Sequence, residues 1–154
     1  MPHTAPSLIR VGPLVTAVIA QTTTWAEFPK LWPRLLSQVY GFVRTRPDLA
    51  TGTSDELWQN VMLYKNDTPD VEVGVLVSMP FEAAGPVTAS ALPGGEVATA
   101  TLNGDYAQLG ATHGAVREFV AAQARELAGP RWEIYGHARP DPTGQETQVF
   151  WLVR

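Results

Sequence analysis

Residues 95–109 read GEVATATLNGDYAQL, and residues 14–28 read LVTAVIAQTTTWAEF. When the two stretches are aligned at a constant offset of 81 positions, Trp25 falls on Tyr106. Each stretch is a strand-like run of apolar residues and threonine, followed by a polar turn and an aromatic residue that opens a helix-like segment. The two stretches therefore predict the same local structure at two places in the chain.

Two further pairs of segments repeat in the same order. Residues 60–70 (NVMLYKNDTPD) resemble residues 131–141 (RWEIYGHARPD) at an offset of 71. Residues 71–77 (VEVGVLV) resemble residues 147–153 (TQVFWLV) at an offset of 76. The offset changes because loops tolerate insertions and deletions. Three matches in one order indicate that the chain is a duplication of a shorter unit.

The duplication predicts a single domain that spans residues 1–154. The first repeat covers about residues 9–80, the second covers about residues 95–154, and an apolar Pro/Gly/Ala linker joins them at about residues 81–94. A chain of 154 residues has the size of one ordinary domain. It can bury enough surface to hold a core without disulfides.

Each repeat predicts the order strand, helix, strand, strand. In the first repeat we expect a strand at about residues 11–21, a helix from residue 25 or 29 to residue 44, and a hairpin of residues 57–64 with 71–79. In the second we expect a strand at about residues 96–102, a helix at 112–127 that stops before Gly129-Pro130, and a hairpin of residues 131–137 with 147–153.

The predicted fold class is α+β, a duplicated strand-helix-strand-strand unit with pseudo-twofold symmetry. Six strands come from the repeats, and the linker can add one or two short strands around residues 87–92, so we expect an antiparallel sheet of six to eight strands. Two main helices should flank a furrow above the middle of the sheet. Such furrows between packed elements are where small-molecule sites form.

Composition excludes several classes of protein. The chain is 45% hydrophobic and 17% charged, which argues against intrinsic disorder. Its net charge of −4 and the lack of a basic cluster argue against direct binding of nucleic acid. There is no cysteine, and His3, His113 and His137 are far apart in the sequence, so we expect neither a metal site nor another cofactor.

No segment predicts targeting or membrane insertion. The N-terminus lacks the pattern of a signal peptide. The longest apolar stretches, residues 11–20 and 71–77, are shorter than the roughly 20 residues that a membrane-spanning helix needs. We therefore expect a soluble cytoplasmic protein.

The sequence resembles the GyrI-like domain, also called the effector-binding domain of bacterial transcription activators. Residues 95–120 (GEVATATLNGDYAQLGATHGAVREFV), residues 129–142 (GPRWEIYGHARPDP) and residues 146–153 (ETQVFWLV) carry the resemblance. It extends over about residues 9–153, because the first repeat fits the family's duplicated unit. The family has Gly-Pro-Tyr at the turn before the second helix, whereas this chain has Gly104-Asp105-Tyr106.

The resemblance implies one of three activities. Many members sit behind a DNA-binding helix-turn-helix and sense lipophilic, often cationic, drugs; others stand alone as drug-binding or gyrase-inhibitory proteins; a few hydrolyse strained electrophilic compounds. No helix-turn-helix fits before Ile9, so we expect no binding of operator DNA. The favoured interpretation is a stand-alone effector- or multidrug-binding protein. The alternatives are a hydrolase that uses the same site residues and a protein-binding inhibitor, and the oligomeric state is open.

Glu133 is the first candidate for a site residue. Strand alternation places Glu133 and Tyr135 on one face of the sheet and Trp132 on the other. In the repeat alignment Glu133 falls on Met62, so one carboxylate would lie at the middle of a two-fold scaffold, opposite an apolar partner. An acid among aromatic rings suits a lipophilic cation. The competing interpretation is an exposed strand residue.

Further candidates are repeat mates of one another. Tyr64 aligns with Tyr135, and Trp32 aligns with His113. Both tyrosines should face the furrow with Glu133, or else pack across strands. Met62 would be an adaptable furrow contact or core. Trp32 and His113 would line the furrow from the helices; alternatively, Trp32 packs in the core and His113 faces solvent.

The remaining aromatic residues are expected to be structural. Trp25 and Tyr106 open the two helices and should act as staples rather than ligand contacts. Trp58 and Trp151 should belong to the core, although either could rim the site. If the protein is an enzyme, Glu133 and Tyr135 are the expected catalytic residues, with Glu133 as general base on water.

Overall fold

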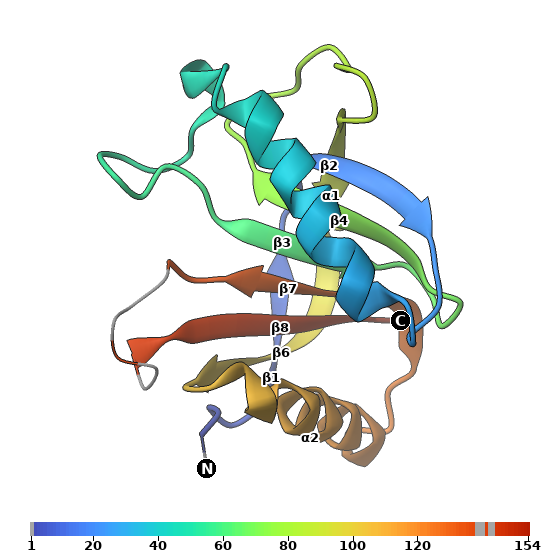
Figure 1. Cartoon of the computed structure of the whole chain (residues 1–154). Helices are drawn as coiled ribbons and strands as arrows, with labels where there is room; N and C mark the ends of the chain where they lie inside the picture. Colours follow the sequence, from blue (N-terminus) through green and yellow to red (C-terminus); the bar gives the residue numbers. More distant parts are fainter. Residues whose placement is uncertain (1, 138–140, 142–143) are drawn as a thin grey trace.

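The computed structural model describes residues 2–137, 141 and 144–154 (Figure 1). Eight strands form one antiparallel sheet in the order β1-β6-β8-β7-β3-β4-β2-β5. The strands are β1 (Ser7–Val11), β2 (Leu14–Thr22), β3 (Asn60–Tyr64), β4 (Asp70–Leu76), β5 (Thr88–Leu92), β6 (Gly95–Asn103), β7 (Leu127–Tyr135) and β8 (Glu146–Val153). The helices are α1 (Phe28–Val43) and α2 (Leu109–Ala122), with short 3-10 turns at Pro47–Leu49 and Tyr106–Gln108.

The strand order is symmetric about the contact between β3 and β7. The unit β2-α1-β3-β4 forms one half of the sheet and the unit β6-α2-β7-β8 forms the other. Equivalent strands lie at equal distances from the centre: β3 and β7 innermost, then β4 and β8, then β2 and β6. The predicted fold class, a duplicated strand-helix-strand-strand unit, is confirmed.

The outermost strands exchange between the halves. β1 precedes β2 in the chain but pairs with β6, and β5 precedes β6 but pairs with β2. The sequence predicted one strand over residues 11–21, whereas the structure breaks this segment at Gly12-Pro13. A proline has no N–H to continue a ladder. A Cβ at Gly94 would lie 2.8 Å from Cδ of Pro13, so the two crossing connections meet there.

Helix α2 ends earlier than the sequence predicted. It stops at Ala122, and Ala124 has a positive φ of 54°. The N–H of Arg125 donates to the carbonyl of Val120 at 3.1 Å, which is the Schellman pattern of a helix end. The predicted stop, Gly129-Pro130, lies instead within β7, where the pairing with β8 is irregular between Leu127 and Arg131.

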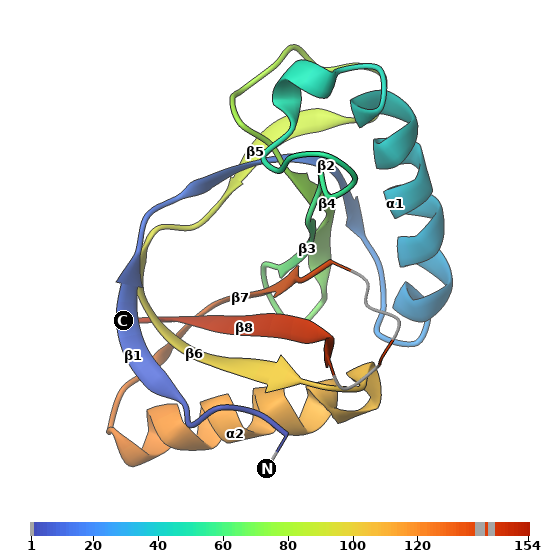
Figure 2. The same cartoon turned by 90° about the vertical axis from the view of Figure 1, so that its left-hand side faces the viewer.

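Both helices pack on the same side of the curved sheet, and β3, β7 and β8 are visible between them (Figures 1 and 2). Helix α1 buries Leu31, Leu35 and Val39 at helical spacing against the sheet. Helix α2 buries Thr112, Val116 and Val120 in the same way. No helix in the described part of the chain is long and apolar enough to cross a membrane.

The opposite face of the sheet carries a second apolar core. Leu63, Trp132, Ile134 and Phe150 are buried in it, and the rings of Trp132 and Phe150 stack with centroids 5.7 Å apart. Since side chains alternate along a strand, burying Trp132 and Ile134 on this face turns Glu133 toward the helices. The middle of the furrow is therefore set by the alternation of β7.

Candidate functional site

Met62 and Glu133 face each other across the contact between β3 and β7. The strands pair so that Val61 lies opposite Ile134, and Met62 opposite Glu133. Met62 and Glu133 are also counterparts in the two repeats, at an offset of 71. Two residues at equivalent positions of the two repeats can lie opposite each other only at the symmetry axis that relates the repeats. The carboxylate of Glu133 therefore marks the centre of the molecule.

Glu133 is buried, with 3% of its surface exposed, and three side chains reach its carboxylate. Oε1 accepts hydrogen bonds from the hydroxyl groups of Tyr64 at 2.9 Å and Tyr135 at 2.5 Å. Oε2 lies 2.7 Å from Nε2 of His113, which comes from α2. β3, β7 and α2 thus each contribute one partner. Hydrogen bonding of this kind is what a buried charge requires.

Trp151, on β8, determines which nitrogen of His113 carries the proton. The indole Nε1 of Trp151 lies 2.9 Å from Nδ1 of His113. An indole N–H is a donor only, so Nδ1 must accept. The proton of a neutral imidazole is then on Nε2 and is donated to Glu133. All three partners of the carboxylate are neutral donors, and the cluster carries the charge of Glu133 itself.

The two tyrosines are held as neutral donors. Burial, and then the negative charge of Glu133, raise the pKa of Tyr64 well above its usual range. The same two causes raise the pKa of Tyr135, with a further contribution from Tyr64. The Sδ atom of Met62 lies 3.7 Å from each hydroxyl oxygen. Each phenol has one proton, and the charged oxygen of Glu133 is the closer and stronger acceptor.

A cavity of about 310 Å³, the aromatic cavity, lies on one side of this cluster. It is mainly apolar and runs between the N-terminal part of α1 and the start of α2. The side chain of Tyr106 meets the edge of Tyr135, with ring centroids 5.7 Å apart, and Phe28 meets the edge of Tyr64 at 5.4 Å. The lining residues are Phe28, Trp32, Leu36, Asn60, Met62, Tyr64, Tyr106, Leu109 and Tyr135.

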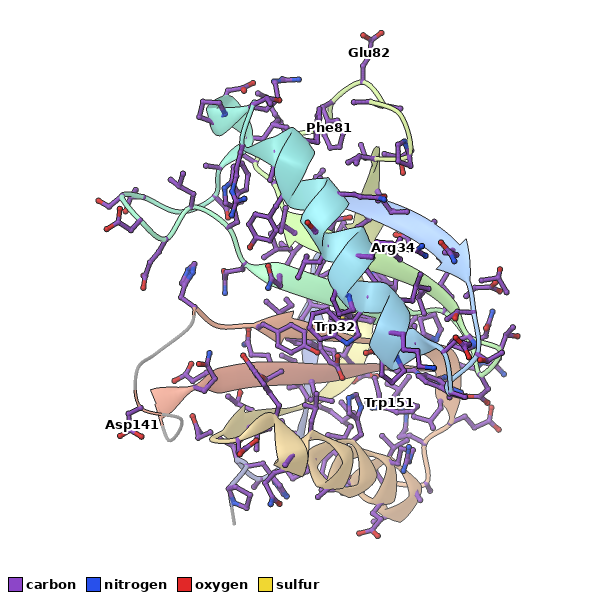
Figure 3. The ribbon with its side chains drawn as sticks, in the orientation of Figure 1. Trp32, Arg34, Phe81, Glu82, Asp141 and Trp151 are labelled. Atoms are coloured by element: carbon purple, nitrogen blue, oxygen red, sulfur yellow. The ribbon has the colours of Figure 1, made fainter. Side chains whose placement is uncertain are left out.

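A second cavity of about 430 Å³, the arginine cavity, lies on the other side of Tyr64. It is more polar than the first, and Tyr64 borders both. Its lining residues are Trp25, Tyr64, Asp67, Gly110, His113, Arg117, Arg131, Glu133 and Trp151. Figure 3 shows the side chains of Trp32 and Trp151 in the space between the two helices, one toward α1 and the other toward α2.

Every candidate chosen from the sequence borders one of the two cavities. Trp32 and Met62 line the aromatic cavity together with both tyrosines, and His113 and Glu133 line the arginine cavity. Their binding roles stay predictions, because the structure gives their positions only. The alternative interpretation of Glu133 and His113 was that their side chains face solvent. The structure buries both instead, since the side chains are 4% and 14% exposed.

Several lining residues were not chosen from the sequence. Trp25 and Tyr106, expected to be helix staples, are 47% and 49% exposed and border the arginine and aromatic cavities respectively. A signal was present, because they are repeat mates at the start of the two helices. Trp151, expected in the core, is buried but also reaches His113. Arg131 could have been found by alternation, since it shares a face of β7 with Glu133.

The site offers no obvious place for a metal ion. Within the described residues no three His, Asp or Glu side chains gather as metal ligands. The polar groups of the cluster are instead satisfied by one another. What the arrangement can do is present a buried negative charge beside aromatic rings, or exchange a proton between a carboxylate and a phenol.

Comparison with known proteins gives matches among solved structures alone. No family model matches the chain, and no curated protein matches it. The crystal structure of the EcmrR C-terminal domain superimposes with a TM-score of 0.78 at 17% identity and covers 100% of this chain and 99% of that one.

Two further structures have the same fold. SAV2435 bound to tetraphenylphosphonium matches with a TM-score of 0.66 at 12% identity, covering 98% of this chain and 94% of that one. A hydrolase from Listeria innocua matches with a TM-score of 0.60 at 12% identity, covering 100% and 94%. At such identities the likeness concerns the fold. The chain therefore has the fold of the GyrI-like effector-binding domains, as the resemblance of its sequence implies.

Proposed function

We propose that this protein is an effector-binding protein that takes up lipophilic aromatic cations in the furrow between α1 and α2. The observation that carries the proposal is the buried carboxylate of Glu133, whose three hydrogen-bond partners are all neutral. A negative charge without a cationic partner in direct contact is costly in a protein interior. A bound cation would supply the missing counter-charge.

The aromatic cavity supports the cationic and lipophilic character of the ligand. Both hydroxyl protons point to Glu133, so the oxygen lone pairs of Tyr64 and Tyr135 are left for the cavity side. The rings of Trp32 and Tyr106 offer dispersion and cation–π attraction. Charge and rings thus favour the same ligand class.

The comparison supports the same ligand class. SAV2435, which has this fold, is bound to tetraphenylphosphonium, a lipophilic aromatic cation. A cavity of about 310 Å³ falls within the range of small-molecule sites. Tyr106 and Trp25 are partly exposed at the borders of the furrow, so a ligand can reach both rings.

Titration with tetraphenylphosphonium, followed by tryptophan fluorescence, tests the proposal. We expect saturable micromolar binding by the wild type and about tenfold weaker binding by Glu133→Gln, or about 1.4 kcal/mol. The matched control is Glu126→Gln, because the side chain of Glu126 is 78% exposed and lies outside both cavities. Equal affinity of the wild type and Glu133→Gln would contradict the role of the carboxylate.

Hydrolysis of a strained electrophile is the second candidate, and the hydrogen bond from Tyr135 to Glu133 favours it, because it joins a proton donor to a base. A carboxylate has about four acceptor positions, and three are used, so one remains for a water molecule. In epoxide opening, the water oxygen would bond to the ring carbon as the carbon–oxygen bond breaks, and Glu133 would take the water proton. Tyr135 would protonate the ring oxygen and regain its proton from Glu133.

A panel of small epoxides separates the two candidates. The hydrolase interpretation expects diol formation that Glu133→Gln abolishes and Tyr135→Phe slows. If the protein binds tetraphenylphosphonium but turns over no epoxide, the hydrolase interpretation is contradicted and the binding function stands. The protein-binding inhibitor of the gyrase-inhibitory type stays a prediction of the resemblance.

A further inference from the structure

In the arginine cavity, unlike the aromatic cavity, arginine side chains of the protein itself already lie over the aromatic rings. The guanidinium carbon of Arg131 lies 4.9 Å from the ring centroid of Trp151 and 5.6 Å from that of Trp25. The guanidinium carbon of Arg117 lies 5.5 Å from the centroid of Trp151. A ligand cation placed here would find both rings in use and two like charges beside it.

Arg131 is held in place but keeps donors for a further partner. It is 7% exposed, on β7 directly opposite Trp151 on β8. Its Nη1 donates to the carbonyl of Gly129 at 3.1 Å and its Nη2 to Oδ1 of Asp67 at 2.6 Å. A guanidinium has five N–H donors, so these two contacts do not exhaust it. The side chain of Asp67 is 93% exposed, so water weakens its pairing with Arg131.

Arg117, on α2, approaches the same cavity from the other side. In the part of the chain that the structure describes, the ring of Trp151 is its one side-chain partner, and no hydrogen bond or ion pair reaches its guanidinium. His113 adds no positive charge, because Trp151 holds it as a neutral donor to Glu133. Two guanidinium groups with free donors therefore converge on a cavity of about 430 Å³.

We propose that the arginine cavity is a subsite for an acidic group, a carboxylate or a sulfonate, carried by the same ligand whose aromatic cation fills the aromatic cavity. This inference rests on the proposed function and narrows the ligand class to aromatic zwitterions. The acid accepts from Arg117 and Arg131, since a guanidinium matches the geometry of such groups. The ligand cation lies in the aromatic cavity, beside the tyrosines that hydrogen-bond Glu133. The acid lies in the arginine cavity, where the two guanidinium groups offset its repulsion from Glu133, which also lines that cavity.

Rhodamine 123 and rhodamine 110 test the subsite, because the first is the methyl ester of the second. The ester is a cation, and the free acid is a zwitterion on the same ring system. We expect the wild type to bind the acid at least threefold more tightly than the ester in a fluorescence anisotropy titration. Arg117→Gln should weaken binding of the acid about tenfold and leave the ester unchanged within twofold. Arg34→Gln, an exposed arginine on α1 outside both cavities, is the matched control.

The outcomes separate the subsite from the binding function. If the ester binds but the acid binds more weakly, and Arg117→Gln changes neither, the subsite is wrong and the cation site stands. If the acid alone binds and Arg117→Gln weakens it, the subsite stands and the cation site is contradicted. If neither dye binds, both proposals are contradicted. Arg131→Lys, which keeps the charge but loses the planar fork, should give a smaller loss for the acid than Arg117→Gln if the protein remains folded.

Discussion

The indole N–H of Trp151 donates to Nδ1 of His113 at 2.9 Å, and this contact determines the charge of the whole cluster. Because Nδ1 is an acceptor, Nε2 must be the donor to Glu133. The proton order runs from Trp151 through His113 to the carboxylate, with Tyr64 and Tyr135 donating from the other side. One carboxylate is thus held without a charged partner at the centre of the furrow.

Glu133→Gln should destabilise the protein through His113 as well as remove a charge. With its oxygen toward the tyrosines, the amide of glutamine turns its N–H₂ to the N–H of His113. With the amide turned over, the phenol protons lose the carboxylate and keep only the thioether of Met62, a weak acceptor. A tautomer change only moves the conflict to Trp151. One buried donor is left without a partner, which costs about 1–3 kcal/mol. Urea denaturation should report this loss in the free energy of unfolding.

A double-mutant cycle tests whether the unpaired donor at His113 causes the loss of stability in Glu133→Gln. Trp151→Phe removes the indole donor, so His113 can carry its proton on Nδ1 and accept from glutamine. The unfolding free energies of Glu133→Gln and Trp151→Phe should therefore be coupled, with the double variant at least about 0.5 kcal/mol more stable than the sum of the two losses predicts. Additive losses would show that the protonation state of His113 is not held by Trp151.

The tyrosines should make the protein sensitive to alkali. The pKa values of Tyr64 and Tyr135 are raised by burial and by Glu133, so the folded state keeps protons that the unfolded state releases above about pH 10. The stabilisation is complete below that pH and decreases as the pH rises further. Tyr64→Phe and Tyr135→Phe should each flatten the decrease. Ultraviolet absorbance can follow the ionisation of the four tyrosines in the folded protein. If all four ionise near pH 10, this account is contradicted.

Tyr106 should affect binding while the protein stays folded. It is 49% exposed and lines the aromatic cavity, where its ring meets Tyr135. Tyr106→Ala should weaken tetraphenylphosphonium about two- to tenfold, since an aromatic contact contributes about 0.5–1.5 kcal/mol. The free energy of unfolding should fall by no more than about 1.5 kcal/mol, through the lost ring contact with Tyr135. Met79→Ala, at a similarly exposed residue outside the cavities, should change neither quantity.

The sequence predicted the centre of the site because two independent patterns select Glu133. The duplication places it at the symmetry axis, and the alternation of side chains along β7 turns it toward the helices. The repeat alignment placed Met62 on Glu133, and in the structure these residues face each other at the axis. What the sequence could not give is the register of β7 against β8 within the second unit. That register brings Arg131 opposite Trp151 and so creates the arginine cavity.

The end of α2 shows a second limit of prediction from sequence. Gly129-Pro130 has the composition of a helix stop, yet the helix already ends at Ala122 by a positive φ at Ala124. An alanine in this conformation is disfavoured locally and is recognisable only from the Schellman hydrogen bonds around it. The Pro140-Asp141 part of the second hairpin, which contributed to the repeat alignment, lies partly outside the described residues.

The most direct test of the central claim compares tetraphenylphosphonium with tetraphenylborate, an anion of nearly the same size and shape. Calorimetric titration should show at least tenfold tighter binding of the cation by the wild type, because the charge of Glu133 has no cationic partner in contact. In Glu133→Gln, checked for folding, the two affinities should come within about threefold. Equal binding of the two ions by the wild type, or a preference for the cation that survives Glu133→Gln, would contradict the claim that this carboxylate selects the ligand.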